Sequence, residues 1–225
     1  MKLVYHPLDL TIDVNQDKNL LLIIESPRVF SEITESIFWG IEGGASGFNL
    51  LLQDNVLVLN KCALFCHSPL LISLNDKKFV SSLYKQLQLI LSNEKTYLNE
   101  FNRLMVEFEK LLAKVEIDSD FLLSTDGAPS FSSMLKVFNV QVDDKSTSIY
   151  ERLIDYISLV SKVILNNPIV IFTHILSFIS KEEFLVISKH AVSLGVRLIC
   201  IESKDCDLSD EYIQKNIIDS DLCLI

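Results

Sequence analysis

An acidic segment near the middle of the chain has residue types and a spacing that suit a calcium ion. Glu116, Asp118 and Asp120 occupy alternate positions, so an extended backbone would present three carboxylates on one side. Calcium prefers such hard oxygen ligands. The segment is not an EF-hand loop, because Phe121 stands where the turn glycine is needed and Gly127 where the bidentate glutamate is needed. The alternatives are a calcium site at Glu116, Asp118 and Asp120 or an ordinary solvated acidic loop.

Cys62, Cys66 and His67 place three zinc-type ligands within six residues. A structural zinc site needs a second ligand pair at matched spacing, and the other cysteines and histidines supply no such motif. Five cysteines in a chain of 225 residues fit reduced thiols better than a disulfide framework. We therefore expect buried free thiols at Cys62 and Cys66.

His174 is the one histidine whose position suits catalysis. It follows an apolar run, and ligands in open α/β sheets bind beyond the carboxyl ends of strands. No nucleophile-elbow or cysteine-protease signature accompanies the four histidines. A metal-dependent enzyme, a nuclease or phosphohydrolase using Asp118, Asp120 and His174, is therefore the alternative to a non-enzymatic function.

The turn at 24–28 lies where a nucleotide-binding α/β protein would carry its phosphate loop. The glycines and the terminal Gly-Lys-Ser/Thr of such a loop are missing there. The glycine cluster at 43–47 follows a predicted helix and contains no lysine. Nucleotide hydrolysis is therefore disfavoured.

Basic side chains at the ends of predicted elements are the candidates for contact with phosphate, since they can reach outward without a helix partner. They are Arg28, Lys61, Lys77, Lys78 and Lys136. For each of them, an ordinary solvated surface charge is the alternative. The sequence shows no recognition-helix pattern and no interleaving of aromatic with basic residues. We therefore expect any binding to address the nucleic-acid backbone, independently of sequence.

Two parts of the sequence predict strands that are buried on both faces. Residues 20–24 and 168–172 are short, continuous apolar runs. The second run is followed by a capping-box motif at 180–183, a helix that ends near Gly195, and another strand at 196–201. This βαβ order requires a parallel sheet with a right-handed crossover, so the predicted fold class is α/β.

Between these parts lies a long helical pattern without Gly or Pro, from Asp76 to about Val115. Its apolar residues recur at three- and four-residue steps: Val80, Leu83, Leu87, Ile90, Tyr97, Phe101, Leu104, Phe108, Leu111 and Val115. The pattern predicts one long helix, or two with a break at 92–93. A second stripe at 149–163 favours an intramolecular helical hairpin over an intermolecular coiled coil. We predict a head domain from 1–75 and 167–225, with an inserted helical arm at 76–166.

The chain is acidic overall, with 20 basic and 30 acidic residues and a net charge of −10. Hydrophobic residues at 49% exclude a disordered chain. The last 24 residues contribute −5, whereas Lys61–Lys114 carries +3. A symmetric assembly could gather the basic segments around its axis, so the total charge does not exclude DNA. The sequence shows no secretion signal and no membrane span, and we expect a cytoplasmic protein without a membrane partner.

Six short segments, taken in order, carry a family resemblance. They are Leu8–Ile12, Leu74–Lys77, Ile149–Leu153, Ile169–Phe172, Ser177–Glu183 and Leu198–Glu202. Their order and spacing resemble those of the small CRISPR-associated protein of subtype II-A systems, which acts in spacer acquisition during antiviral defence. The resemblance spans nearly the whole chain, although residues 40 to 70 depart from the family pattern.

The resemblance implies an α/β head similar to P-loop ATPases but without their nucleotide motif. It implies a homotetrameric ring that binds ends of double-stranded DNA in a basic channel, without catalysis, alongside the integrase proteins and the RNA-guided nuclease. Calcium supports the assembled form in the family, and the matching acidic positions are Glu116, Asp118 and Asp120. A third alternative, besides DNA binding and enzymatic activity, is a pure oligomerisation scaffold.

Overall fold

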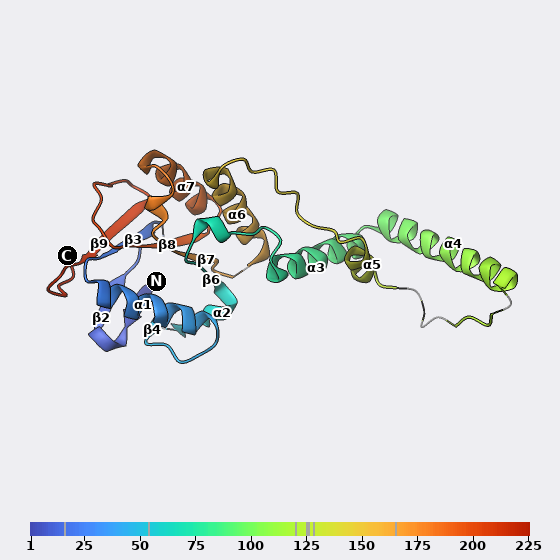
Figure 1. The fold of residues 1–225 in the computed structure, drawn as a ribbon, viewed down its shortest axis with the longest axis horizontal. Coiled ribbons are helices and arrows are strands. Elements are labelled where there is room, and N and C mark those ends of the chain that lie inside the picture. Colours follow the sequence, from blue (N-terminus) through green and yellow to red (C-terminus); the bar gives the residue numbers. More distant parts are fainter. Residues whose placement is uncertain (16, 54, 120, 125–126, 128, 165) are drawn as a thin grey trace. The chain divides into compact units, whose positions relative to one another are not determined.

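The chain divides into two units, which are drawn in Figure 1. The first unit comprises Met1–Leu74 and Asp144–Ile225, and the second comprises Asn75–Asp143. This computed structural model describes residues 1–15, 17–53, 55–119, 121–124, 127, 129–164 and 166–225. Asp120, one of the predicted calcium ligands, lies outside the described residues.

A five-stranded parallel sheet forms the centre of the first unit. In spatial order its strands are β6 (Ala63–Cys66), β7 (Ile169–Thr173), β8 (Arg197–Glu202), β3 (Asn19–Ile24) and β9 (Ile213–Ile218). Every residue of β3 and β7 is buried, which explains their continuous apolar sequences, since such strands are covered on both faces. The predicted α/β fold class with a parallel sheet is confirmed.

Helices α1 (Pro27–Ile41), α2 (Leu59–Cys62), α6 (Ile149–Val163) and α7 (Lys181–Ser193) accompany this sheet. The predicted βαβ unit is β7–α7–β8. Helix α7 begins with a complete capping box, in which Ser180 and Glu183 satisfy each other's backbone N–H groups. Beyond its end Gly195 adopts a φ of +68°, a conformation that L residues with a Cβ rarely adopt. Local sequence signals therefore set both ends of α7.

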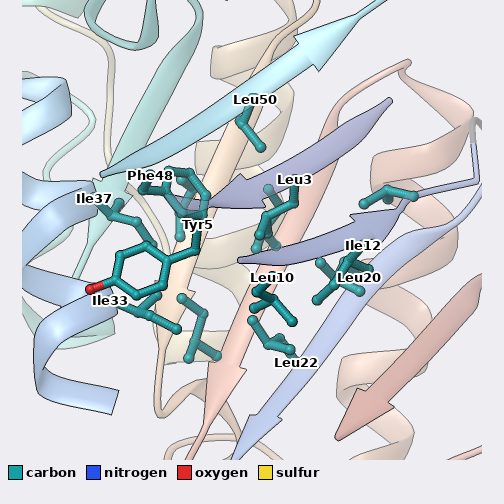
Figure 2. Packing of buried hydrophobic residues seen from close by; sticks show 14 of the residues in the cluster. Leu3, Tyr5, Leu10, Ile12, Leu20, Leu22, Ile33, Ile37, Phe48 and Leu50 are labelled. Atoms are coloured by element: carbon teal, nitrogen blue, oxygen red, sulfur yellow. The ribbon is translucent and has the colours of Figure 1, made fainter. Parts of the chain in front are cut away.

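A small antiparallel sheet packs beside the parallel one. Its strand order is β2 (Leu10–Asp13), β1 (Lys2–Tyr5), β4 (Phe48–Leu52) and β5 (Asn55–Val56). Figure 2 shows side chains of this sheet meeting Leu20 and Leu22 of β3 and Ile33 and Ile37 of α1, all of them buried. Burial of this cluster fixes the small sheet and α1 against the parallel sheet.

The second unit contains α3 (Lys77–Asn93), α4 (Lys95–Ser119) and α5 (Phe131–Val137). Helices α3 and α4 are separated by Glu94, whose φ of −99° and ψ of 103° are extended. This break lies one residue beyond the predicted one. Phe131 of α5 meets Phe101 of α4 edge to face, with ring centroids 5.5 Å apart.

Helix α6 belongs to the first unit and not to the helical arm. It buries Leu153, Tyr156, Ile157 and Val160, and it packs against α7. The helical arm is therefore residues 75–143 rather than 76–166, and α6 does not form the predicted hairpin with the long helices. The stripe on α6 does bury one helix face, but its partner is another part of the head.

Helix α4 consequently keeps its apolar stripe uncovered within the described chain. No residue of α4 is buried, and Tyr97, Leu104, Phe108, Leu111 and Val115 are each 49–58% exposed. An exposed apolar row of this length is typical of an association surface. Three 3-10 turns complete the described structure: η1 (His6–Leu8), η2 (Pro69–Leu71) and η3 (Ile175–Ser177). None of the described helices combines the length and apolar character needed to cross a bilayer.

Candidate nucleic-acid interface

A basic pocket of about 640 Å³ lies within the second unit, between α3 and α5. Three lysines line it: Lys77 and Lys85 of α3, and Lys136 of α5. Hydroxyl and amide side chains complete the polar part of the lining: Asn75, Ser81, Tyr84, Ser132, Asn139 and Gln141. All of these groups can donate a hydrogen bond, so the pocket offers positive charge and neutral donors together.

The sequence explains why one face of α3 lines the basic pocket. The lining positions 77, 80, 81, 84 and 85 follow the i, i+3, i+4, i+7, i+8 pattern of a single helix face. Asp76 precedes the helix, which runs without glycine or proline to Asn93. Lys77 and Lys85 therefore project from the same side of α3, about two turns apart.

Side chains of this same region hold the segment that returns along α3. Asn75 bonds both backbone groups of Val142: its Oδ1 accepts from the N–H at 2.8 Å and its Nδ2 donates to the carbonyl at 3.0 Å. The Tyr84 hydroxyl donates to the carbonyl of Val140 at 3.0 Å. Gln88 Oε1 accepts from the backbone N–H of Ser132 at 3.2 Å. These bonds fix α5, and with it Lys136, beside α3.

No acidic side chain that the structure describes neutralises the charge of the basic pocket. Lys77, Lys85 and Lys136 are exposed, and none of them pairs with an acidic side chain anywhere in the described residues. No Asp or Glu is found among the described residues that line the pocket. Three unneutralised amines around one hollow repel one another, and an anion placed there relieves that repulsion. The geometry therefore suits phosphate groups.

The structure brings together two of the five predicted phosphate contacts, Lys77 and Lys136. Lys78 is exposed on α3 but does not line the basic pocket. Arg28 and Lys61 belong to the first unit, on α1 and α2, and the Arg28 Nε donates to Glu32 at 2.8 Å. A contact between DNA and any of these five residues stays a prediction.

Lys85 was missed by the sequence reasoning, which searched the ends of elements. It lies in the middle of α3, eight residues after Lys77. The helical-face pattern that includes both lysines was present in the sequence and would have identified it. Its pairing with Lys136 depends on the packing of α5, which no local pattern indicates.

The predicted calcium ligands Glu116 and Asp118 do not lie on an extended segment. Both belong to the last turn of α4, where two residues turn the chain by roughly 200°, so the side chains leave on different sides. Glu116 Oε1 also accepts from the backbone N–H of Leu123 at 3.1 Å. Among the described residues, no group of three His, Cys, Asp or Glu side chains is placed to hold a metal ion. The third predicted ligand, Asp120, lies outside the described residues, so a calcium site at Glu116, Asp118 and Asp120 stays a prediction.

The cysteine prediction is confirmed. Cys62 and Cys66 are buried free thiols, and Cys66 Sγ lies 3.4 Å from the carbonyl of Ser68. Burial raises the pKa of Cys66 to about 12. At neutral pH that thiol is therefore protonated and a poor metal ligand or nucleophile.

His174 follows β7 with a left-handed φ of 54° and stacks on Phe30, with centroids 4.7 Å apart. Its Nδ1 lies 3.8 Å from Glu202 Oε2. Glu202 Oε1 accepts from the N–H of Leu176 at 2.9 Å, so this carboxylate caps η3. Burial raises the pKa of Glu202. His174 lies in the first unit and Asp118 in the second, so the residues of the predicted metal enzyme come from separate units.

Comparison with known proteins agrees with the architecture. A family model described as CRISPR-associated protein (Cas_Csn2) matches residues 47–222, more than half of the chain. The fold is similar to the crystal structure of Stu0660 of Streptococcus thermophilus, with a TM-score of 0.63 at 13% sequence identity. That match covers 96% of this chain and 74% of the other. Taken with the parallel sheet and the long-helix arm, the family match shows that the chain belongs to the Csn2 family of CRISPR-associated proteins.

Proposed function

We propose that this protein binds double-stranded DNA without catalysing a reaction, as part of CRISPR spacer acquisition in antiviral defence. The observation that carries the proposal is the convergence of Lys77, Lys85 and Lys136 on one pocket whose described lining has no acidic residue. Membership in a CRISPR-associated family supplies the biological setting.

Binding is to the phosphate backbone and is independent of sequence. Lysine amines are point charges that neutralise phosphates and release counterions, and they carry no base information. Lys78, Arg28 and Lys61 are the further contacts that we expect. We expect DNA ends to be preferred, because a duplex can enter a closed protein ring only by one of its ends.

The assembly that we propose is a homotetrameric ring. The exposed stripe on α4 supports it, because apolar side chains about half exposed gain free energy when a second subunit covers them. Symmetry would then gather four basic pockets, which offsets the acidity of each chain. The integrase proteins and the RNA-guided nuclease of the same system are the expected protein partners. We expect the protein to act in the cytoplasm, where its five cysteine thiols would stay reduced.

We propose that calcium supports assembly of the ring, and we assign no ligand set to it. Glu116 and Asp118 lie in the last turn of α4, and Asp120 lies outside the described residues. Support by calcium is therefore tested on the assembled protein.

A gel-shift assay tests the proposal with linear and covalently closed duplexes of the same length, with and without calcium. We expect the linear duplex to bind, the closed duplex to bind less, and calcium to strengthen binding by the tetramer. Labelled DNA recovered intact after incubation with magnesium or manganese supports a non-enzymatic function. Equal binding of both topologies contradicts end threading, and a stable tetramer with no DNA affinity at low salt indicates a scaffold instead.

A variant carrying Lys77→Gln, Lys85→Gln and Lys136→Gln tests the basic pocket. Its matched control carries Lys95→Gln, Lys110→Gln and Lys114→Gln on α4, which removes the same charge from the same unit outside the pocket. We expect the first variant to lose most of its DNA binding and the control to keep most of it. Equal losses would assign binding to overall charge and not to the pocket.

A further inference from the structure

A second, smaller pocket lies in the first unit, beyond the carboxyl ends of β6 and β7. Its walls are aromatic: Phe30 and Phe38 of α1, Phe65 of β6, and His67, which follows β6. This aromatic pocket has a volume of about 230 Å³. In open α/β sheets this edge is where ligands bind. Neither the predicted DNA contacts nor the basic pocket includes any of these residues.

The hydroxyl groups in the aromatic pocket are already engaged. Thr34 Oγ1 donates to the carbonyl of Phe30 at 2.8 Å, and Thr173 Oγ1 donates to the carbonyl of His67 at 3.2 Å. Neither hydroxyl proton is therefore available to an anionic ligand. No lysine or arginine is present among the described lining residues.

Glu35 supplies the one formal charge of the described lining. It is exposed on α1, and it forms no ion pair or hydrogen bond with any other residue that the structure describes. A phosphate would meet this carboxylate with repulsion, whereas a cation would meet attraction from the carboxylate and from the faces of the aromatic rings. The lining chemistry therefore selects for positive charge.

The aromatic pocket is large enough for one cationic side chain. Its volume corresponds to about eight water molecules at ~30 Å³ each. A guanidinium fits the walls better than an ammonium, because it is planar, weakly hydrated and able to stack on aromatic faces.

The charge of the first unit indicates where such a side chain comes from. The first unit has 20 of the chain's 30 acidic residues and 12 of its 20 basic residues, so its net charge is −8. The second unit has 10 acidic and 8 basic residues, a net of −2. This net negative charge favours a basic partner protein.

We propose that the aromatic pocket is a docking site for an arginine side chain of a basic partner protein. The arginine stacks against Phe38 and Phe65, because His174 already covers one face of Phe30, and it pairs with Glu35 at the rim. Buried arginines of this kind are common anchors of protein interfaces. The site stands whether or not the second unit binds DNA, because it uses different residues.

The test titrates the full chain with a short arginine-rich peptide and with the same peptide carrying citrulline, its uncharged analogue. Trp39 is the only tryptophan, and its ring centroid is 5.2 Å from that of Phe38, so its fluorescence reports on the pocket wall. We expect a saturable change with the arginine peptide. Cation–π attraction makes its binding about 2- to 30-fold tighter than that of the citrulline peptide.

Variants distinguish binding in the aromatic pocket from binding by general charge attraction. We expect Glu35→Gln and Phe38→Leu each to weaken binding of the arginine peptide. Glu42→Gln removes the same charge at the end of α1 and should leave that binding unchanged. DNA binding by all three variants should match the wild type, which keeps this result distinct from failure of the proposed function. Equal binding of both peptides, equal effects of Glu35→Gln and Glu42→Gln, or tighter binding of a free nucleoside would overturn the proposal.

Discussion

The side-chain amide of Asn75 bonds both backbone groups of Val142, as a neighbouring strand would. The two residues lie at opposite ends of the second unit in sequence, so this contact closes the unit. Because the closing segment carries α5, the same contact helps to hold Lys136 opposite Lys77 and Lys85.

Replacing Asn75 with alanine should loosen this closure. Loss of two hydrogen bonds costs about 1–3 kcal/mol. Faster hydrogen exchange at the Val142 amide would report the loss directly, and DNA binding should weaken as Lys136 loses its support. Asn93→Ala, at the exposed end of α3, is the control and should leave exchange at Val142 unchanged. Unchanged exchange in Asn75→Ala would contradict the assigned role.

The side chain of Ser180 should stabilise α7, whereas that of Ser26 should not stabilise α1. Both stand at helix N-cap positions, but only the Ser180 side chain accepts a cap bond, from Glu183 N–H at 3.2 Å. Ser180→Ala is expected to cost about 1 kcal/mol, and Ser26→Ala much less. Chemical denaturation of the two variants measures the difference, and equal losses would refute the capping argument.

Glu202 should make stability depend on pH. Burial raises its pKa in the folded state, whereas the backbone N–H groups of Leu176 and Ile175 partly oppose that shift. A raised carboxyl pKa means that the folded state holds the proton more tightly. The contribution of Glu202 to stability is therefore fully present below the ordinary glutamate pKa of 4.5. It is lost as the pH rises through the pKa of Glu202 in the folded state.

Urea denaturation at several pH values above 4.5 checks this sign. Glu202→Gln should remove that part of the decline, so the stability of the variant should fall less with rising pH than that of the wild type. His174 faces Glu202 and is the other titratable group to control, through His174→Gln. A steeper decline in Glu202→Gln would contradict the expected direction.

The stripe on α4 should hold subunits together. Phe108→Asp places a charge in its centre, where burial against a second chain would cost several kcal/mol. Light scattering should show a smaller assembly than the wild type. Ala113→Asp adds the same charge on the opposite side of α4 and should leave the assembly intact. A tetramer that survives Phe108→Asp would place the interface elsewhere.

The parallel sheet could be predicted from the sequence because its signals are local. The continuous apolar runs of β3 and β7, the capping box at Ser180 and the terminal Gly195 each act within a few residues. The element against which a helix packs is not indicated by such local signals. The stripe on α6 predicts a buried face but not what covers it, so α6 was assigned to the arm although it packs in the head.

The candidate site was only partly predictable for the same reason. Lys77 and Lys136 are 59 residues apart in sequence, and they meet because α5 returns along α3 through bonds from Asn75, Tyr84 and Gln88. The alternation at Glu116 and Asp118 suggested an extended segment. Helix α4 instead continues to Ser119, because the helical pattern of the preceding turns runs on without Gly or Pro.

The salt dependence of DNA affinity tests the central claim most directly. Each lysine that neutralises a phosphate steepens the slope of log K against log salt by about 1. The dissociation constant of a linear duplex should be measured at several salt concentrations, for the wild type and for the variant lacking Lys77, Lys85 and Lys136. We predict a slope shallower by about 3 per chain in the variant. An identical slope in both proteins would contradict phosphate binding in the basic pocket.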